Sequence, residues 1–183
     1  MGVSPVADGR VYWRHLDPAD GTFTIRPARP GDGEAFIGLV RALAAFEKLS
    51  PPDDAAVRRL VADAFGPRPR FDLLVAEVQE MVRGYALFFE TYSSFRALPS
   101  LYLEDLFVHP DVRGRGIGGA MMRELARTAV RRGCGRFEWT VLDWNEGAQR
   151  FYRSLGAGIL REWFLCRVDG DALAALGRAS SLD

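Results

Sequence analysis

The chain has 183 residues, with 24 basic and 24 acidic side chains, and 48% of its residues are hydrophobic. This composition excludes a disordered chain, and the length fits one domain whose core needs no disulfide or metal. Balanced charge gives no bulk attraction to nucleic acid or to a membrane surface. No apolar run reaches the ~18 residues of a membrane helix, and the first ten residues predict no secretory signal.

The reactive side chains are few and scattered. Cys134 and Cys166 lie far apart in apolar segments, which favours two reduced thiols in the core of a cytoplasmic protein. His15 and His109 are isolated from each other and from the cysteines, so the sequence predicts no metal site.

The first part of the chain predicts an appendage, a strand and a helix. Residues 1–21 are rich in turn formers, and order begins with the alternating strand Thr22–Arg26, which Pro27 stops. Asp32 is the expected N-cap of a helix whose apolar face ends at Glu47. Glu47 lies either in solvent or at the rim of a cavity.

A second helix is expected over Asp53–Phe65, followed by three runs rich in β-formers. The runs Phe71–Val78 and Arg83–Glu90 are joined by a short link and predict a hairpin. The third run is Leu101–Val108. The linker Thr91–Ser100 before it has a length typical of a functional loop.

After His109 the pattern becomes helical. Apolar residues recur every four positions from Ile117, and Gly133 is the expected end of that helix. The remaining predicted elements are a strand over Phe137–Leu142, a helix capped by Asn145, a strand over Ile159–Val168 and a short helix over Asp171–Leu176.

This order predicts an α/β fold with one domain over residues 22–183. Its mixed central sheet has antiparallel N-terminal strands and helices on both faces. The Leu101 and Phe137 strands form a parallel pair, joined by a right-handed crossover helix.

The segment 108–119 (VHPDVRGRGIGG) between strand and helix is the most informative. Its glycines let a ligand approach the backbone, and the first N–H groups of the helix attract anions. Arg113 and Arg115 add positive charge. The segment therefore predicts a site for a phosphate or pyrophosphate.

Three phosphate motifs compete here. A Walker P-loop is excluded, because it requires a lysine that the segment lacks. Gly114, Gly116 and Gly119 fit the dinucleotide pattern GxGxxG, with Glu138 about twenty residues on, but five residues separate the first glycine from the strand. The third pattern is RxxGxG, formed by Arg113, Gly116 and Gly118.

With this third pattern the chain resembles the GCN5-related N-acetyltransferases (GNAT). The resemblance to their diamine and thialysine acetyltransferase branch extends over about residues 22–176. It includes Ile25–Ala28, the helix end Ala45–Glu47, the run Leu101–Val108 and the segment Val141–Ala157 (VLDWNEGAQRFYRSLGA).

The resemblance implies acetyl-CoA as donor, with its pantetheine arm paired to one strand and its pyrophosphate held by the glycine turn. The residues so implied are Leu106, Phe107 and Val108 for pantetheine, Arg113, Gly114, Arg115, Gly116, Ile117, Gly118 and Gly119 for pyrophosphate, and Asn145 near the next helix.

It also implies catalytic and substrate residues. Tyr152 matches the tyrosine beside the CoA sulfur, where a phenol donates a proton to the leaving thiolate. Glu104 is the expected acceptor of the amine's proton. The substrate positions are Glu47, Asp105 and Trp163, together with Ser93 and Phe95, which stand where diamine-specific members carry an acidic residue.

The sequence thus predicts an enzyme that transfers acetyl from acetyl-CoA to a primary amine of a small cationic or amino-acid-like substrate, by direct attack in a ternary complex. The resemblance also implies a homodimer, and the sequence predicts a cytoplasmic protein with no nucleic-acid or membrane partner. The alternatives are a protein N-terminal or lysine acetyltransferase, a non-catalytic acyl-CoA sensor and, more distantly, a nicotinamide-dependent enzyme.

Overall fold

The structure of the chain, a computed structural model, describes residues 23–178. The predicted appendage over 1–21 and the first residue of the predicted strand, Thr22, lie outside this range. Contacts divide the chain into two compact units, Met1–Thr140 and Val141–Asp183. The single domain over 22–183 stays a prediction.

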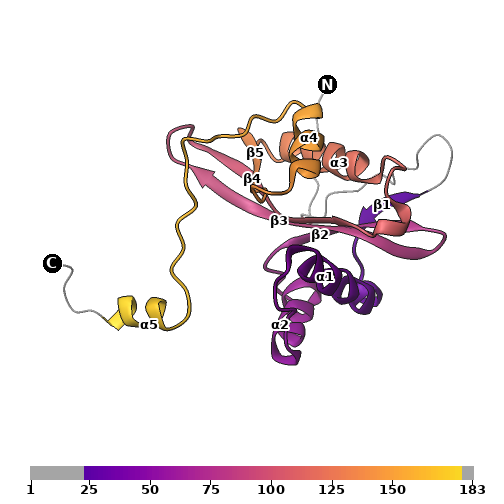
Figure 1. Ribbon diagram of the computed structural model, residues 1–183, viewed down its shortest axis with the longest axis horizontal. Helices are drawn as coiled ribbons and strands as arrows, with labels where there is room; N and C mark the ends of the chain where they lie inside the picture. The colour runs from indigo at the N-terminus through magenta and orange to yellow at the C-terminus, as the bar shows by residue number, and fades with distance from the viewer. Residues whose placement is uncertain (1–22, 179–183) are drawn as a thin grey trace, which may run out of the picture. The chain divides into compact units, whose positions relative to one another are not determined.

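The first unit is built on a five-stranded mixed sheet in the order β1-β2-β3-β4-β5 (Figure 1). The first four strands pair antiparallel, whereas β4 and β5 pair parallel, with Leu101 opposite Phe137. The predicted fold class and the predicted parallel pair are confirmed. The strands are β1 (Thr24–Pro27), β2 (Asp72–Val78), β3 (Met81–Ser93), β4 (Leu98–Val108) and β5 (Arg136–Trp139).

Helices cover both faces of this sheet, as predicted. Helices α1 (Gly33–Glu47) and α2 (Asp54–Phe65) lie on one face, and α3 (Ile117–Arg131) lies on the other (Figure 1). Two 3₁₀ turns, η1 (Pro30–Asp32) and η2 (Pro110–Val112), precede α1 and α3. Helix α3 is the crossover between the parallel strands.

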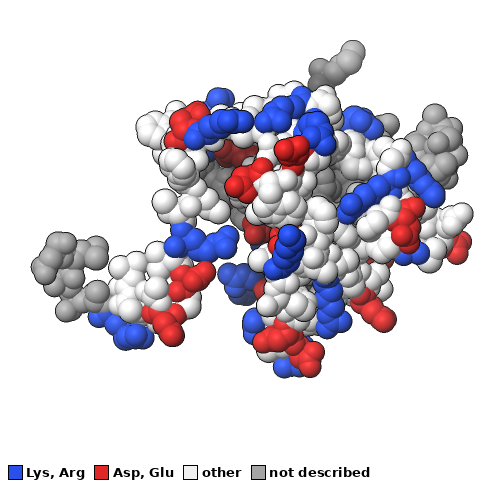
Figure 2. Space-filling view, viewed as in Figure 1, with Lys and Arg blue, Asp and Glu red and all other residues white. Residues whose placement is uncertain are grey.

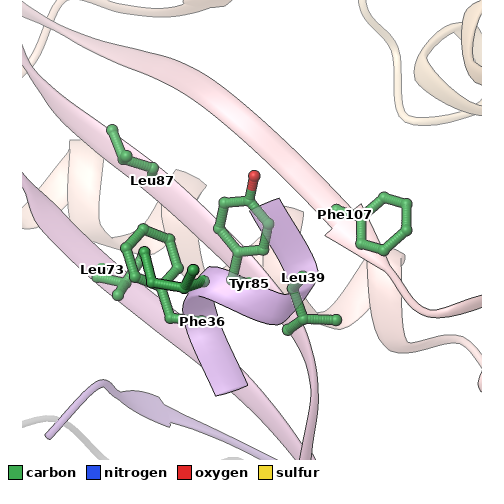
Figure 3. Packing of buried hydrophobic residues seen from close by; sticks show 7 residues of the cluster. Phe36, Leu39, Leu73, Tyr85, Leu87 and Phe107 are labelled. Atoms are coloured by element: carbon green, nitrogen blue, oxygen red, sulfur yellow. The ribbon is translucent and has the colours of Figure 1, made fainter. Parts of the chain in front are cut away.

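The core under α1 forms because alternate strand residues point to one face. Side chains of α1 pack there against β2, β3 and β4, and the partly buried apolar face of α2 completes the cluster. The buried members are Phe36, Ile37, Leu39, Leu73, Tyr85, Leu87 and Phe107, most of them labelled in Figure 3.

The predicted loop over Thr91–Ser100 is wrong. Strand β3 extends to Ser93 and β4 begins at Leu98, and these two residues pair across a short turn over 94–97. Consecutive serines and Pro99 suggested a loop, but cross-strand pairing extends the ladder through them, and a proline is tolerated near a strand end.

The prediction that the Asp32 side chain caps the helix is also wrong. Asp32 is the N-cap of α1 by position, but its carboxylate makes no cap hydrogen bond to the helix. It accepts two hydrogen bonds from Arg26, at 2.7 and 2.9 Å, and one from the backbone N–H of Arg29. Glu77, which is half-buried, accepts from the same guanidinium, so this ion triad ties β1 and β2 to the start of α1.

The second unit contains two helices, α4 (Glu146–Ser154) and α5 (Gly170–Arg178). Asn145 caps α4 as predicted, because its side chain accepts from the N–H of Ala148 at 3.1 Å. The predicted strand Ile159–Val168 is wrong: these residues have no regular secondary structure. An alternating apolar pattern forms a strand only where a neighbouring strand supplies hydrogen bonds.

Both cysteines are free, but Cys166 is exposed and Cys134 only half-buried, so the prediction that both lie in the core is wrong. Figure 2 shows charges of both signs interspersed over the visible face. No helix within residues 23–178 is long and apolar enough to cross a membrane.

Candidate active site

The strand β4 has one uncovered edge near its C-terminal end. Strand β5 pairs with β4 only from Ser100 to Leu103, so no described strand covers residues 104–108 on that side. Unpaired N–H and C=O groups along a strand edge pair readily with an extended ligand. This edge is therefore suited to an elongated ligand with amide groups.

The alternating direction of the backbone groups along β4 determines which residues can hydrogen-bond a ligand at that edge. His109 donates its N–H to the carbonyl of Arg83 in β3 at 2.8 Å. Since backbone groups alternate in direction along a strand, those of Leu106 and Val108 point away from β3, and those of Phe107 point toward it. The Phe107 side chain also lies in the core. Of the three predicted residues, Leu106 thus offers both backbone groups to a ligand, and Val108 offers its N–H, since its carbonyl accepts from Arg113.

A β-bulge places Glu104 at the start of the uncovered edge. Asp105 pairs with Leu87 and Leu103 pairs with Phe88, which leaves Glu104 without a partner in β3. Bulges redirect side chains and are frequent beside active sites. The Glu104 side chain is exposed, whereas Asp105 next to it is half-buried.

Three carboxylates gather where α1 ends over this part of β4. The pKa of Asp105 is raised to about 6, first of all by burial; the hydrogen bond from Tyr85 lowers it, and the charges of Glu104 and Glu47 raise it. Burial also raises the pKa of Glu47. Glu47 is half-buried rather than fully exposed to solvent. The cluster attracts a cation.

The glycine turn before α3 presents bare backbone. Gly114 and Gly116 adopt φ of 77° and 80°, a region that favours glycine, and Gly116 is the N-cap of α3 without a side chain to cap it. The first intrahelical bond runs from Ala120 to Gly116, so the N–H groups of residues 117–119 have no intrahelical acceptor. This arrangement suits an anion.

Arg113, predicted as part of the turn that holds the pyrophosphate, also makes contacts within the chain. Its Nε donates to the carbonyl of Val108 at 2.8 Å, and its guanidinium lies 5.5 Å from the ring centroids of both Phe46 and Phe107. The side chain thus ties the turn to the end of α1. Arg115 in the same turn is exposed.

Ser93 and Phe95 are not brought to the carboxylates within the chain. Ser93 is buried, and its hydroxyl accepts from the N–H of Arg96, while Phe95 is fully exposed in the hairpin turn. Leu98, the partner of Ser93, is seven positions before Asp105 in β4, about 23 Å along the strand.

The other predicted site residues belong to the second unit. The Asn145 side chain is used in capping α4. Tyr152 is the buried residue of α4, and its ring centroid lies 5.3 Å from that of Phe151. Trp163 is largely exposed in the segment without regular structure.

No group of histidine, cysteine and carboxylate side chains suited to a metal ion occurs among residues 23–178. Two residues that contact predicted site residues were not predicted from the sequence: Tyr85, whose hydroxyl donates to Asp105, and Phe46, whose ring lies against Arg113. Tyr85 is the one hydroxyl-bearing residue in the buried cluster beneath α1, and that isolated hydroxyl is the signal that marks it.

Comparison with known proteins gives a consistent result. The model of the acetyltransferase (GNAT) family matches residues 38–157. A thialysine N-epsilon-acetyltransferase of Mus musculus is 39% identical over 163 residues, which cover 83% of this chain and 95% of that protein. An L-ornithine N5-acetyltransferase of Arabidopsis thaliana is 44% identical over 98 residues, which cover 54% of this chain and 43% of that protein.

Solved structures agree on the fold. An aminoglycoside N-acetyltransferase in complex with CoA superposes with a TM-score of 0.66 at 20% identity, covering 87% of this chain and 99% of that one. At this identity the similarity shows the fold alone.

Proposed function

The chain belongs to the acetyltransferase (GNAT) family, and from this premise we propose that it acetylates a small, cationic, amino-acid-like amine in a ternary complex. It is an N-acetyltransferase, and acetyl-CoA is the donor. The proposal of a cationic substrate rests on the carboxylate cluster of Glu47, Glu104 and Asp105 beside the uncovered edge of β4.

The donor occupies the uncovered edge and the glycine turn. The pantetheine amides pair with the backbone of Leu106 and Val108. The pyrophosphate lies against the N–H groups of residues 117–119, with Arg115 adding charge. Arg113 keeps the turn in place through Val108 and the two rings that it contacts.

The acceptor amine is drawn in as a cation. An alkyl ammonium with a pKa near 10.4 is inert until it loses a proton, which Glu104 accepts directly or through water. The free amine attacks the thioester carbon, and backbone N–H groups of the uncovered edge stabilise the oxyanion. The C–S bond then breaks, and the thiolate takes a proton from Tyr152. The new amide nitrogen releases one proton, which balances the proton that Tyr152 gives up.

The substrate is a short amine with an amino-acid character. Relatives named for thialysine and L-ornithine support this proposal. The remaining parts are that the enzyme acts in the cytoplasm as a homodimer and without nucleic acid. Free thiols among the described residues support the cytoplasm, balanced charge supports the absence of nucleic acid, and the homodimer rests on the family resemblance alone.

A thiol-release assay with acetyl-CoA tests the proposed reaction. We expect lysine analogues and ornithine to be acetylated with higher kcat/KM than spermidine, aminoglycosides or peptides. Glu104→Gln, which keeps the shape and removes the base, is expected to lower kcat by about 10²-fold or more. Preference for a peptide would indicate a protein acetyltransferase, and acetyl-CoA binding without turnover would indicate a sensor.

The glycine turn supplies a separate prediction. Gly118→Asp places a carboxylate where the pyrophosphate is proposed to lie, so acetyl-CoA affinity falls at least ~tenfold, about 1.4 kcal/mol by calorimetry. Gly38→Asp adds the same charge on the exposed side of α1, where an added Cβ meets nothing within 4 Å, and is the matched control. Unchanged affinity in a folded Gly118→Asp protein would place the pyrophosphate elsewhere.

A further inference from the structure

Tyr85 is held rigidly in the core beneath α1. Its ring is fully buried, and Phe36 of α1 packs edge-on against it, with centroids 5.2 Å apart and an angle of 74° between the rings. Figure 3 shows the hydroxyl of Tyr85 pointing away from the surrounding apolar side chains. Packing requires only an aromatic ring at this position. The hydroxyl must have a hydrogen-bond partner, because burying it without one destabilises the fold.

The partner of that hydroxyl is Asp105. Tyr85 Oη donates to Asp105 Oδ2 at 3.1 Å. The two residues are diagonal neighbours on one face, since Tyr85 pairs with Phe107 and Asp105 pairs with Leu87. A rigid ring therefore fixes one oxygen of this carboxylate.

The groups that face Asp105 are otherwise acidic. Glu47 comes from α1 and Glu104 from β4 itself, and both act against the ionised form. Among the described ion pairs, none gives Asp105 a cationic partner. The Tyr85 hydroxyl is thus the described donor that favours the charged carboxylate.

We propose that Tyr85 is a positioning residue for amine recognition: its hydroxyl fixes Asp105 and stabilises the carboxylate charge that binds the substrate ammonium. This inference rests on the proposed function, because it takes Asp105 as an amine-binding group. Tyr85 itself does not contact the substrate, and it acts through Asp105.

The direction of the effect follows from the hydrogen bond. The pKa of Asp105 is about 6, so the carboxylate is mostly charged at pH 7. The pKa of Tyr85 is raised, first by burial and then by Asp105, so the phenol remains a donor. Removing the hydroxyl takes away the one interaction that lowers the pKa of Asp105, and the carboxylate then becomes protonated at higher pH.

Tyr85→Phe is the test, because it keeps the ring and removes only the hydroxyl. We expect the Asp105 titration, followed by NMR in protein labelled with ¹³C at the aspartate carboxyls, to move up by about one pH unit, which corresponds to about 1.4 kcal/mol. Asp105→Asn identifies the signal. The pH at which KM for the amine begins to rise moves by the same amount, while kcat at pH 8 changes less than about threefold.

Two comparisons make the result specific. Tyr102→Phe removes a hydroxyl from β4 that is not among the described hydrogen-bond donors to Asp105, so the Asp105 titration and the pH dependence of KM are expected to stay unchanged. In the Asp105→Asn background, Tyr85→Phe has no further effect on KM, because coupled residues do not add.

An unchanged Asp105 titration in Tyr85→Phe would overturn the proposal, and so would a shifted titration with an unchanged KM profile. Wild-type protein without turnover on any amine would instead contradict the proposed function. The NMR titration needs no substrate, so it still decides whether Tyr85 holds Asp105.

Discussion

Tyr152→Phe is expected to lower kcat by about 10²–10⁴-fold while acetyl-CoA affinity stays within about twofold. The change keeps the ring and removes only the hydroxyl, which is proposed to donate the proton to the leaving thiolate. General acid catalysis of this kind contributes a rate factor of that size. Single-turnover measurements give the rate constant of the acetyl-transfer step, and kcat equals this constant where chemistry limits the rate.

The control for this variant is Tyr92→Phe. Tyr92 lies at the far end of β3 and is about two-thirds exposed, so losing its hydroxyl leaves kcat unchanged. If Tyr152→Phe keeps kcat within about threefold, the hydroxyl has no catalytic role and Tyr152 serves only packing in α4.

Asp32→Asn is expected to destabilise the fold by about 3–5 kcal/mol. Arg26 is 7% exposed, and Asp32 binds its guanidinium through both carboxylate oxygens, so the variant leaves a buried cation only partly compensated by Glu77. Denaturant unfolding followed by circular dichroism gives the free energy. Glu146→Gln breaks an exposed pair with Arg150 and costs less than about 0.5 kcal/mol.

The pH dependence of this loss has a definite sign. Burial raises the pKa of Asp32, but the hydrogen bonds from Arg26 and Arg29 outweigh it, so the pKa lies below the ordinary value of 3.8. A depressed carboxyl pKa stabilises the fold above the unfolded value, and this contribution disappears as pH falls through the folded pKa. The difference between wild type and Asp32→Asn therefore shrinks below about pH 4. A difference independent of pH would show that the triad does not act through charge.

Local patterns predicted the elements that depend on local chemistry. The helix from Ile117, the cap at Asn145 and the parallel pairing of Leu101 with Phe137 all follow from periodicity, capping residues and the rule for crossovers. These features depend only on residues close in sequence, or on the usual crossover connection between parallel strands. They also determine the position of the glycine turn and the carboxylates of β4.

The errors arose where distant residues decide the structure. The β3–β4 ladder continues through Ser93 and Pro99 because each strand supplies the other's partners. The Asp32 carboxylate binds Arg26 and not the helix N–H groups, and both Arg26 and its other partner Glu77 lie in other segments. The bulge at Glu104 and the bond between Tyr85 and Asp105 depend on a register that a single strand does not encode.

The short parallel pair between β4 and β5 also bears on how the chain folds. Strands β3 and β4 are joined by a turn of a few residues, and such hairpins form in about 1–10 µs. Phe137 reaches Leu101 only after the chain has passed through α3, and non-local pairings of this kind form late. The strand edge proposed for the donor thus belongs to a hairpin that forms early, and the late pairing at Ser100–Leu103 sets where that edge begins.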